Sequence, residues 1–116
     1  MQHFEKSSFS MCGDENVHAF YSKFADRKHA VLYGLEAHVC IRMTALDLIS
    51  QGYTVHLVVD SCSSMSHGDR NIAIEALRDA GVRMTSFQSL VFELLQDAKH
   101  PKFKDCLALL KMNPKE

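Results

Sequence analysis

Residues 31–51 decide the fold of this chain, and they read Val-Leu-Tyr-Gly-Leu-Glu-Ala-His-Val-Cys-Ile-Arg-Met-Thr-Ala-Leu-Asp-Leu-Ile-Ser-Gln. The apolar run at 31–34 is typical of a strand buried on both faces of a parallel sheet. From Ala37 onward, apolar residues recur at the spacing of a helix. The turn at 34–36 therefore joins a strand to a helix at the carboxyl end of the strand, which is the edge where open α/β sheets bind ligands.

Cys40 falls in the first turn of the predicted helix. Free backbone N–H groups and the helix dipole favour an anion there, so a thiol at this position tends toward the nucleophilic thiolate. The alternative is that Cys40 is a small buried hydrophobe, as most lone cysteines are. The other three cysteines have no CxxC spacing, and we interpret them as free packing residues: Cys12, Cys62 and Cys106.

Composition narrows the possible functions. The 116 residues, 47% of them hydrophobic, predict one domain spanning 1–116. A net charge of −1 gives no electrostatic case for a nucleic-acid or acidic-membrane partner, and no apolar run approaches the ~20 residues of a membrane span. The histidines lack metal-ligand spacing, so we expect no metal and no cofactor. Free thiols favour a reducing, intracellular location, with the cytoplasm expected first and mitochondria and peroxisomes left open.

The rest of the chain alternates between strand and helix patterns. Strands are predicted at 53–60 and 82–85, and helices at 15–26, 69–80, 87–99 and 101–112, with Asp69 as the cap of the helix at 69–80. Met11 to Asp14 reads as a polar loop. This alternation predicts an α/β fold, a three-layer αβα arrangement around a parallel sheet with right-handed crossovers.

Two blocks carry a resemblance to a known family. Residues 34–40 read Gly-Leu-Glu-Ala-His-Val-Cys, and residues 58–64 read Val-Val-Asp-Ser-Cys-Ser-Ser. Together with Asp69-Arg70 and the residues around Lys6, they resemble the isochorismatase-like cysteine hydrolases, and among these the isochorismatase domain-containing proteins. The similarity covers nearly the whole chain, and it implies the isochorismatase-like hydrolase fold.

The resemblance implies a site with three catalytic parts, two of which are present. Cys40 matches the family's nucleophile, and Lys6 matches the lysine that holds the thiolate charge. Leu35–Glu36 matches a peptide bond that is often cis in the family. The N–H groups of Glu36 or Ala37 and of Cys40 would by analogy face a developing oxyanion.

The third part of the family's site is an aspartate at the end of a strand that comes before the lysine. This chain has only five residues before Lys6, so we expect it to be the C-terminal portion of the fold, lacking the N-terminal strands. Asp60 also ends a strand, but we expect its carboxylate to bond backbone amides of the following loop instead of replacing the missing acid.

Two functional classes remain open. The first is a cysteine hydrolase acting on a small amide or an isochorismate-like compound. The second is a non-catalytic, truncated family member that acts as a protein-interaction module. A strand that is apolar on both faces but has lost one neighbour also predicts self-association into a homo-oligomer. A nucleotide-binding flavodoxin-like domain is the weakest idea, because no glycine-rich phosphate loop follows any strand.

Overall fold

The structure is a computed structural model that describes residues 2–112. In chain order its elements are η1 (Met11–Gly13), α1 (Glu15–Ser22), β1 (His29–Gly34), η2 (Ala37–Ile41), α2 (Arg42–Ser50), β2 (Thr54–Cys62), α3 (His67–Asp79), β3 (Arg83–Thr85), α4 (Phe87–Leu95) and α5 (Phe103–Met112). No helix within the described residues is both long and apolar enough to cross a membrane.

The three strands form one parallel sheet in the order β1-β2-β3. Ala30 lies opposite Val55 and Leu32 opposite Leu57, and the register then shifts so that Gly34 lies opposite Cys62. Each connection between neighbouring parallel strands passes through a helix, as such pairing requires. This confirms the predicted α/β fold with a parallel sheet.

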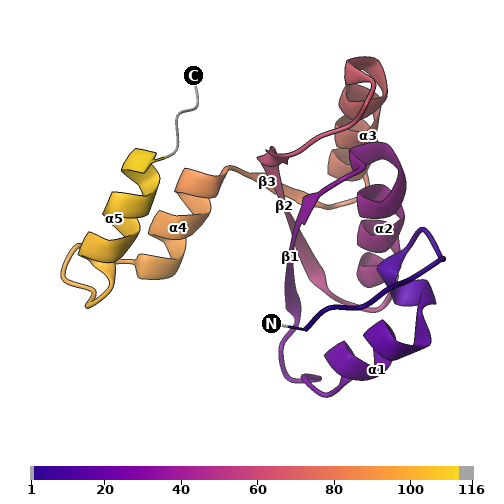
Figure 1. Ribbon diagram of the computed structural model, residues 1–116, viewed down its shortest axis with the longest axis horizontal. Coiled ribbons are helices and arrows are strands. Elements are labelled where there is room, and N and C mark those ends of the chain that lie inside the picture. Colours follow the sequence, from indigo (N-terminus) through magenta and orange to yellow (C-terminus); the bar gives the residue numbers. More distant parts are fainter. Residues whose placement is uncertain (1, 113–116) are drawn as a thin grey trace.

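Helices cover both faces of the sheet. Figure 1 shows α2 and α3 on one face, and α4 with α5 on the other. The core lies between the sheet and the α2–α3 layer, where several apolar side chains have no exposed surface: Ala37, Ala45, Leu57, Ala73 and Leu77. On the opposite face α4 packs against β2 and α5 packs against α4.

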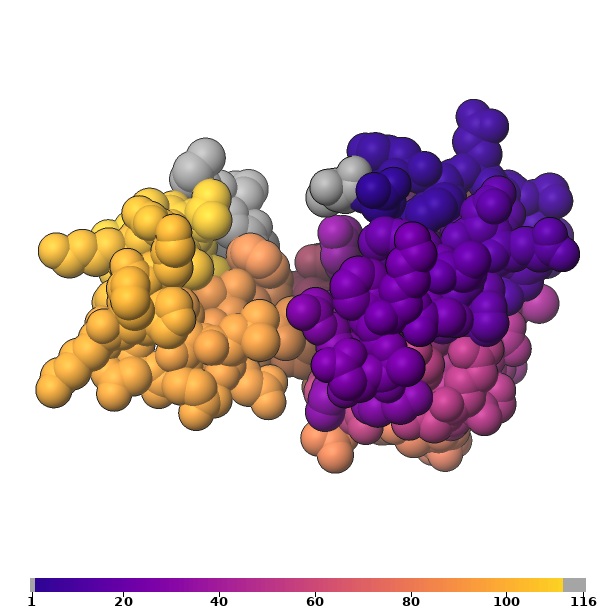
Figure 2. Space-filling model, turned by 90° about the horizontal axis from the view of Figure 1, so that it is seen from below, coloured from indigo at the N-terminus to yellow at the C-terminus, as the bar shows by residue number. Residues whose placement is uncertain are grey.

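The second face of the sheet is much less covered than the first. The prediction that residues 31–34 are buried on both faces is wrong, because Val31 is 42% and Tyr33 is 64% exposed. Figure 2 shows an open cleft between the α4–α5 pair and the rest of the molecule. A hollow of about 330 Å³, lined by residues that include Val31, Tyr33, Phe87 and Leu90, separates β1 from α4.

Several element boundaries differ from the sequence-based expectation. The helix predicted at 69–80 begins at His67, because the Ser66 hydroxyl accepts the N–H of Asp69 and is the cap. α4 ends at Leu95 because Gln96 has a positive φ of 68°. β2 continues two residues beyond Asp60, and η1 occupies part of the segment expected to be a loop.

Candidate active site

Cys40 lies in η2, a single π-helical turn that leads into α2. The expected helix therefore begins with a wider turn than an α-helix has. Turns of this kind are rare and frequently mark functional sites. Neighbouring Ala37 and Ile41 are buried in the core, whereas Cys40 is half-buried, so its thiol is held by packing on one side and open on the other.

Lys6 reaches Cys40 across thirty-four positions of sequence. Its Nζ lies 3.6 Å from Cys40 Sγ. The same ammonium donates to the backbone carbonyls of Ser8 at 2.9 Å and Phe9 at 3.1 Å. Because an ammonium has three donors, all three have a partner, and the position of the charge beside the sulfur is fixed.

Hydrogen bonds tie the N-terminal segment that carries Lys6 to α2. The Ser10 hydroxyl donates to Asp47 Oδ2 at 2.6 Å, and the backbone N–H of Met11 donates to Thr44 Oγ1 at 2.9 Å. Ser10 and Thr44 are both buried. Buried polar groups that have hydrogen-bond partners strongly favour one arrangement. These two contacts therefore fix the position of the segment that carries Lys6 relative to η2.

The loop after β2 fastens the turn between β1 and η2. Ser63 N–H donates to the Gly34 carbonyl at 3.2 Å, and Ala37 N–H donates to the Ser63 carbonyl at 2.9 Å. His38 Nδ1 lies 2.9 Å from Ser64 Oγ, and Met65 N–H donates to Glu36 Oε2 at 3.3 Å. The carboxyl ends of β1 and β2 are thereby joined beneath Cys40.

The guanidinium of Arg70 braces the same region from α3. It donates to the carbonyls of Val59 at 2.6 Å and Cys62 at 3.1 Å. These carbonyls lie where the β1–β2 register shifts, so a charge-assisted donor replaces regular strand pairing there.

The predicted oxyanion region is only partly available. The Leu35–Glu36 peptide bond is cis, as the resemblance implied. The N–H of Ala37, however, is already donated to Ser63. Of the backbone N–H groups expected to face an oxyanion, those of Glu36 and Cys40 remain as candidates. The N–H of Ala37 does not, because it already has an acceptor.

No carboxylate hydrogen-bonds to Lys6 or Cys40 within residues 2–112. Asp60 Oδ1 accepts the backbone N–H of Phe87 at 2.9 Å, at the start of α4. Asp47 is engaged by Ser10 and Glu36 by Met65. In the same part of the chain, no three His, Cys, Asp or Glu side chains gather closely enough to hold a metal ion.

A groove of about 440 Å³ opens above the thiol. Lys6, Cys40 and Leu35 line it together with side chains of β1, with Met11 of η1 and Ile41 of η2, and with Thr44 of α2. Sequence reasoning missed Ser10, Thr44 and Ser64, whose contacts position the site. The run of serines at the carboxyl end of a strand was the available signal for Ser64, whereas Ser10 and Thr44 gave none.

Comparison with known proteins places the chain in a family. The sequence profile of the Isochorismatase domain matches residues 1–89. The chain belongs to the isochorismatase family. Among family members, it is 43% identical over 105 residues to isochorismatase domain-containing protein 2 of Xenopus laevis, covering 90% of this chain and 51% of that protein. It is 41% identical over 113 residues to isochorismatase domain-containing protein 1 of Danio rerio, covering 97% of this chain and 40% of that protein.

A solved structure supports the same isochorismatase-like fold. The structure described as the MAR1 ribonuclease of Caenorhabditis elegans superimposes with a TM-score of 0.86 at 35% identity, over 96% of this chain and 56% of that one. The chain thus spans about half the length of the family members it matches.

Proposed function

We propose that this protein is a hydrolase of the isochorismatase type in which Cys40 is the nucleophile and Lys6 holds its thiolate. The observation that carries the proposal is the 3.6 Å contact between Lys6 Nζ and Cys40 Sγ. The groove beside this contact gives a small substrate access to the sulfur.

The reaction proceeds through a thioester. The Cys40 thiolate attacks the carbonyl carbon of a small amide, and the C–S bond forms as the carbonyl oxygen takes the negative charge. The N–H groups of Glu36 and Cys40 are the proposed donors to that oxygen. The C–N bond then breaks, the leaving nitrogen takes a proton, and water cleaves the thioester to the acid and restores the thiolate.

The proton for the leaving nitrogen comes from water, because no described carboxylate bonds to the site. A positioned general acid or base contributes ~10²–10⁴-fold to such steps. We therefore expect Cys40 to be acylated readily by activated esters but to turn over unactivated amides slowly.

Mass spectrometry with two reagents tests the proposal. Limited iodoacetamide should modify Cys40 before Cys62 and Cys106, because among these three cysteines only Cys40 has a described lysine ammonium in contact with its sulfur. The activated ester p-nitrophenyl acetate should leave one acetyl group on Cys40 and none on a Cys40→Ala variant. Equal labelling of all three cysteines would refute the nucleophile.

A panel of unactivated substrates tests the turnover. Nicotinamide and other small amides should give slow product release, and RNA belongs in the panel because a similar solved structure is described as a ribonuclease. Rapid amide turnover that is abolished by Cys40→Ala would contradict the expectation that fast turnover needs a positioned general acid in addition to Cys40 and Lys6.

The second candidate is a non-catalytic interaction module. The observation that favours it is β1, which lies at the edge of the sheet with Val31, Tyr33 and the following Leu35 exposed. Failure of p-nitrophenyl acetate to acylate Cys40 in the folded chain would favour this candidate over the hydrolase.

A further inference from the structure

The groove that holds Cys40 lies along the open edge of β1. Residues 31–33 of the strand and Leu35 of the turn after it line the groove together with Cys40. Within residues 2–112 the sheet has no strand on that side of β1, and the backbone N–H and C=O groups of Val31 and Tyr33 point there. The groove therefore offers a ligand backbone donors and acceptors as well as a thiol.

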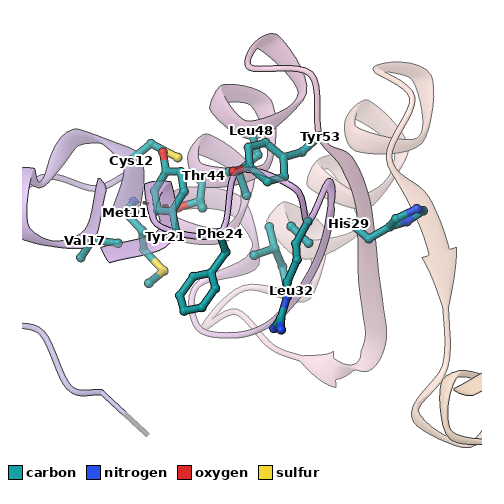
Figure 3. A pocket seen from close by; sticks show the side chains of 12 residues that line it. Met11, Cys12, Val17, Tyr21, Phe24, His29, Leu32, Thr44, Leu48 and Tyr53 are labelled. Carbon is teal, nitrogen blue, oxygen red and sulfur yellow. Dashed lines mark hydrogen bonds between the residues drawn. The ribbon is translucent and has the colours of Figure 1, made fainter. Parts of the chain in front are cut away.

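The two faces of this edge are hollowed separately. Figure 3 shows that His29 points away from Leu32 and the other labelled side chains, as alternation along a strand requires. Val31 and Tyr33 lie on the same face as His29, and both line the hollow of about 330 Å³ between β1 and α4. On the Leu32 face, the groove of about 440 Å³ continues to side chains of η1 and α2. Alternate side chains of an added strand would enter these two hollows in turn.

The polar groups around both hollows already have partners or face water. Thr44 Oγ1 accepts the N–H of Met11. No carboxylate lines either hollow among the described residues, and Lys6 is the only basic side chain there, with its three donors already directed at acceptors. Tyr33 and Ser61 are exposed, so water solvates their hydroxyl groups. A ligand that fits has uncharged side chains, and its polar groups are those of a backbone.

An extended peptide has these properties. Peptides commonly bind by adding a strand to an open sheet edge, where main-chain hydrogen bonds give affinity and alternate side chains enter pockets. A strand paired with β1 would lie about 4.8 Å from it. Since β1 ends at Gly34 and Cys40 lies in the next helical turn, a carbonyl near one end of such a peptide would lie beside the thiol. That carbonyl belongs to an amide, which is the group that Cys40 is proposed to attack.

We propose that the substrates of Cys40 are short, extended peptides that pair with the edge of β1 and carry uncharged side chains. This inference rests on the proposed function, and it places the reacting amide in a peptide backbone. The sulfur bonds to the carbonyl carbon and the peptide C–N bond breaks. The amine fragment leaves with a proton from water, and a further water hydrolyses the thioester.

The test compares alkylation of Cys40 in the full chain by iodoacetamide and by peptides that carry the same reactive group. The peptide is Val-Thr-Val-Thr, which is uncharged and favours an extended backbone. One reagent has an iodoacetyl group on its N-terminus. The other has an acetylated N-terminus and an iodoacetyl group joined through ethylenediamine to its C-terminus, so either strand direction presents the group to Cys40. In every case a C–S bond forms and iodide leaves.

Rates are read at each cysteine by tandem mass spectrometry and divided by the rates with glutathione. At least one peptide reagent should alkylate Cys40 about tenfold faster than iodoacetamide, because two or three backbone hydrogen bonds supply that much. Cys106, which lines neither hollow, should show no preference. The protein is kept dilute, because a second copy of the chain would compete for the same edge.

Two changes identify strand pairing as the cause. N-methylation of every peptide nitrogen in the faster reagent removes its donors but keeps its side chains, and it should abolish the preference. Val31→Pro removes an outward N–H, which an edge strand tolerates, and it should reduce the preference more than Val31→Ala, which keeps that N–H. Circular dichroism reports whether each variant folds, and the N-methylated reagent tests pairing on the unaltered chain.

The two hypotheses fail in different ways. If Cys40 is the fastest thiol with iodoacetamide but neither peptide is preferred, the peptide substrate is overturned and the nucleophile stands. A preference that survives N-methylation overturns pairing with β1. If neither peptide is preferred while the chain associates with itself through β1, the edge takes a second copy of the chain, which also overturns the proposal. If Cys40 is not the fastest thiol with iodoacetamide, the proposed function falls, and the peptide substrate falls with it.

Discussion

At the scale of single residues, the ammonium of Lys6 is held by Ser8, Phe9 and Cys40 at the same time. Two unit charges about 4 Å apart attract by roughly 1 kcal/mol in water and by more inside a protein. Lys6→Met should therefore slow iodoacetamide alkylation of Cys40 by about tenfold or more. Lys6→Arg, which keeps the charge, should recover part of the rate, and Lys23→Met at the C-cap of α1 should not change it. An unchanged rate in Lys6→Met would show that the contact does not activate the thiol.

Gly34 has a φ of +119°, which residues with a Cβ adopt at a cost. Its surroundings are open, so Gly34→Ala would test backbone conformation alone. We expect a loss of about 1 kcal/mol in the free energy of unfolding. Gly68→Ala, the same change within α3, should leave stability unchanged or raise it by up to about 1 kcal/mol. Urea denaturation measures both, and equal effects would contradict the conformational argument.

The sequence identified Cys40 through the pattern of a strand end followed by a helix start, and Lys6 through the family resemblance. It did not identify Ser10, Thr44 or Ser64, because their partners are twenty-six or more positions away in the chain. Periodicity reports which face of an element is buried, and it carries no information on which distant side chain a buried hydroxyl will meet.

At the scale of elements, β1 and β2 are linked at their start by a pair of histidines. His29 Nδ1 lies 3.0 Å from His56 Nε2 with the rings stacked. Burial of the ring, then the neighbouring His29 and Arg83, lower the pKa of His56 below its usual value near 6.5, while Glu93 acts in the opposite direction. The unfolded chain therefore binds this proton more readily than the folded one does.

Stability should consequently decrease as the pH falls below about 6.5, because the linkage favours the state that binds more protons. The contribution of His56 to the free energy of unfolding is complete above the pKa that His56 has in the unfolded chain. It is lost as the pH falls toward the lower pKa that His56 has in the folded chain. The urea concentration at which half of the protein is unfolded should be measured at about pH 7.5 and about pH 5.5. The difference between these two midpoints should be smaller for His56→Gln than for the unaltered chain. His67→Gln, an exposed change at the start of α3, is the control. An undiminished difference in His56→Gln would remove this pair as a source of pH dependence.

The sequence predicted the type and order of the main elements, because their apolar spacing is long and regular. It was less accurate at their ends. Asp69 and Ser66 are both good caps, and only the folded turn shows that the Ser66 hydroxyl meets the N–H three residues on. The length of β2 depends on Arg70 from another element, which no local pattern reveals.

At the scale of the whole molecule, the sheet has an open edge. The carbonyls of Lys28 and Gly34 accept from the β2 side, at Thr54 and Ser63. Because backbone groups alternate along a strand, those of His29, Val31 and Tyr33 face the open side, where the structure places no strand within residues 2–112. Open apolar edges of this kind pair readily with other chains.

We therefore expect the chain to self-associate through β1. Light scattering coupled to size-exclusion chromatography should show a mass that rises with protein concentration. Val31→Lys places a charge on the edge and should lower that mass, since edge lysines oppose strand pairing. Ile72→Lys makes the same kind of change at an exposed apolar residue of α3 and should have no such effect. A monomer at every concentration, or equal effects of the two lysines, would show that the edge of β1 is not the contact surface.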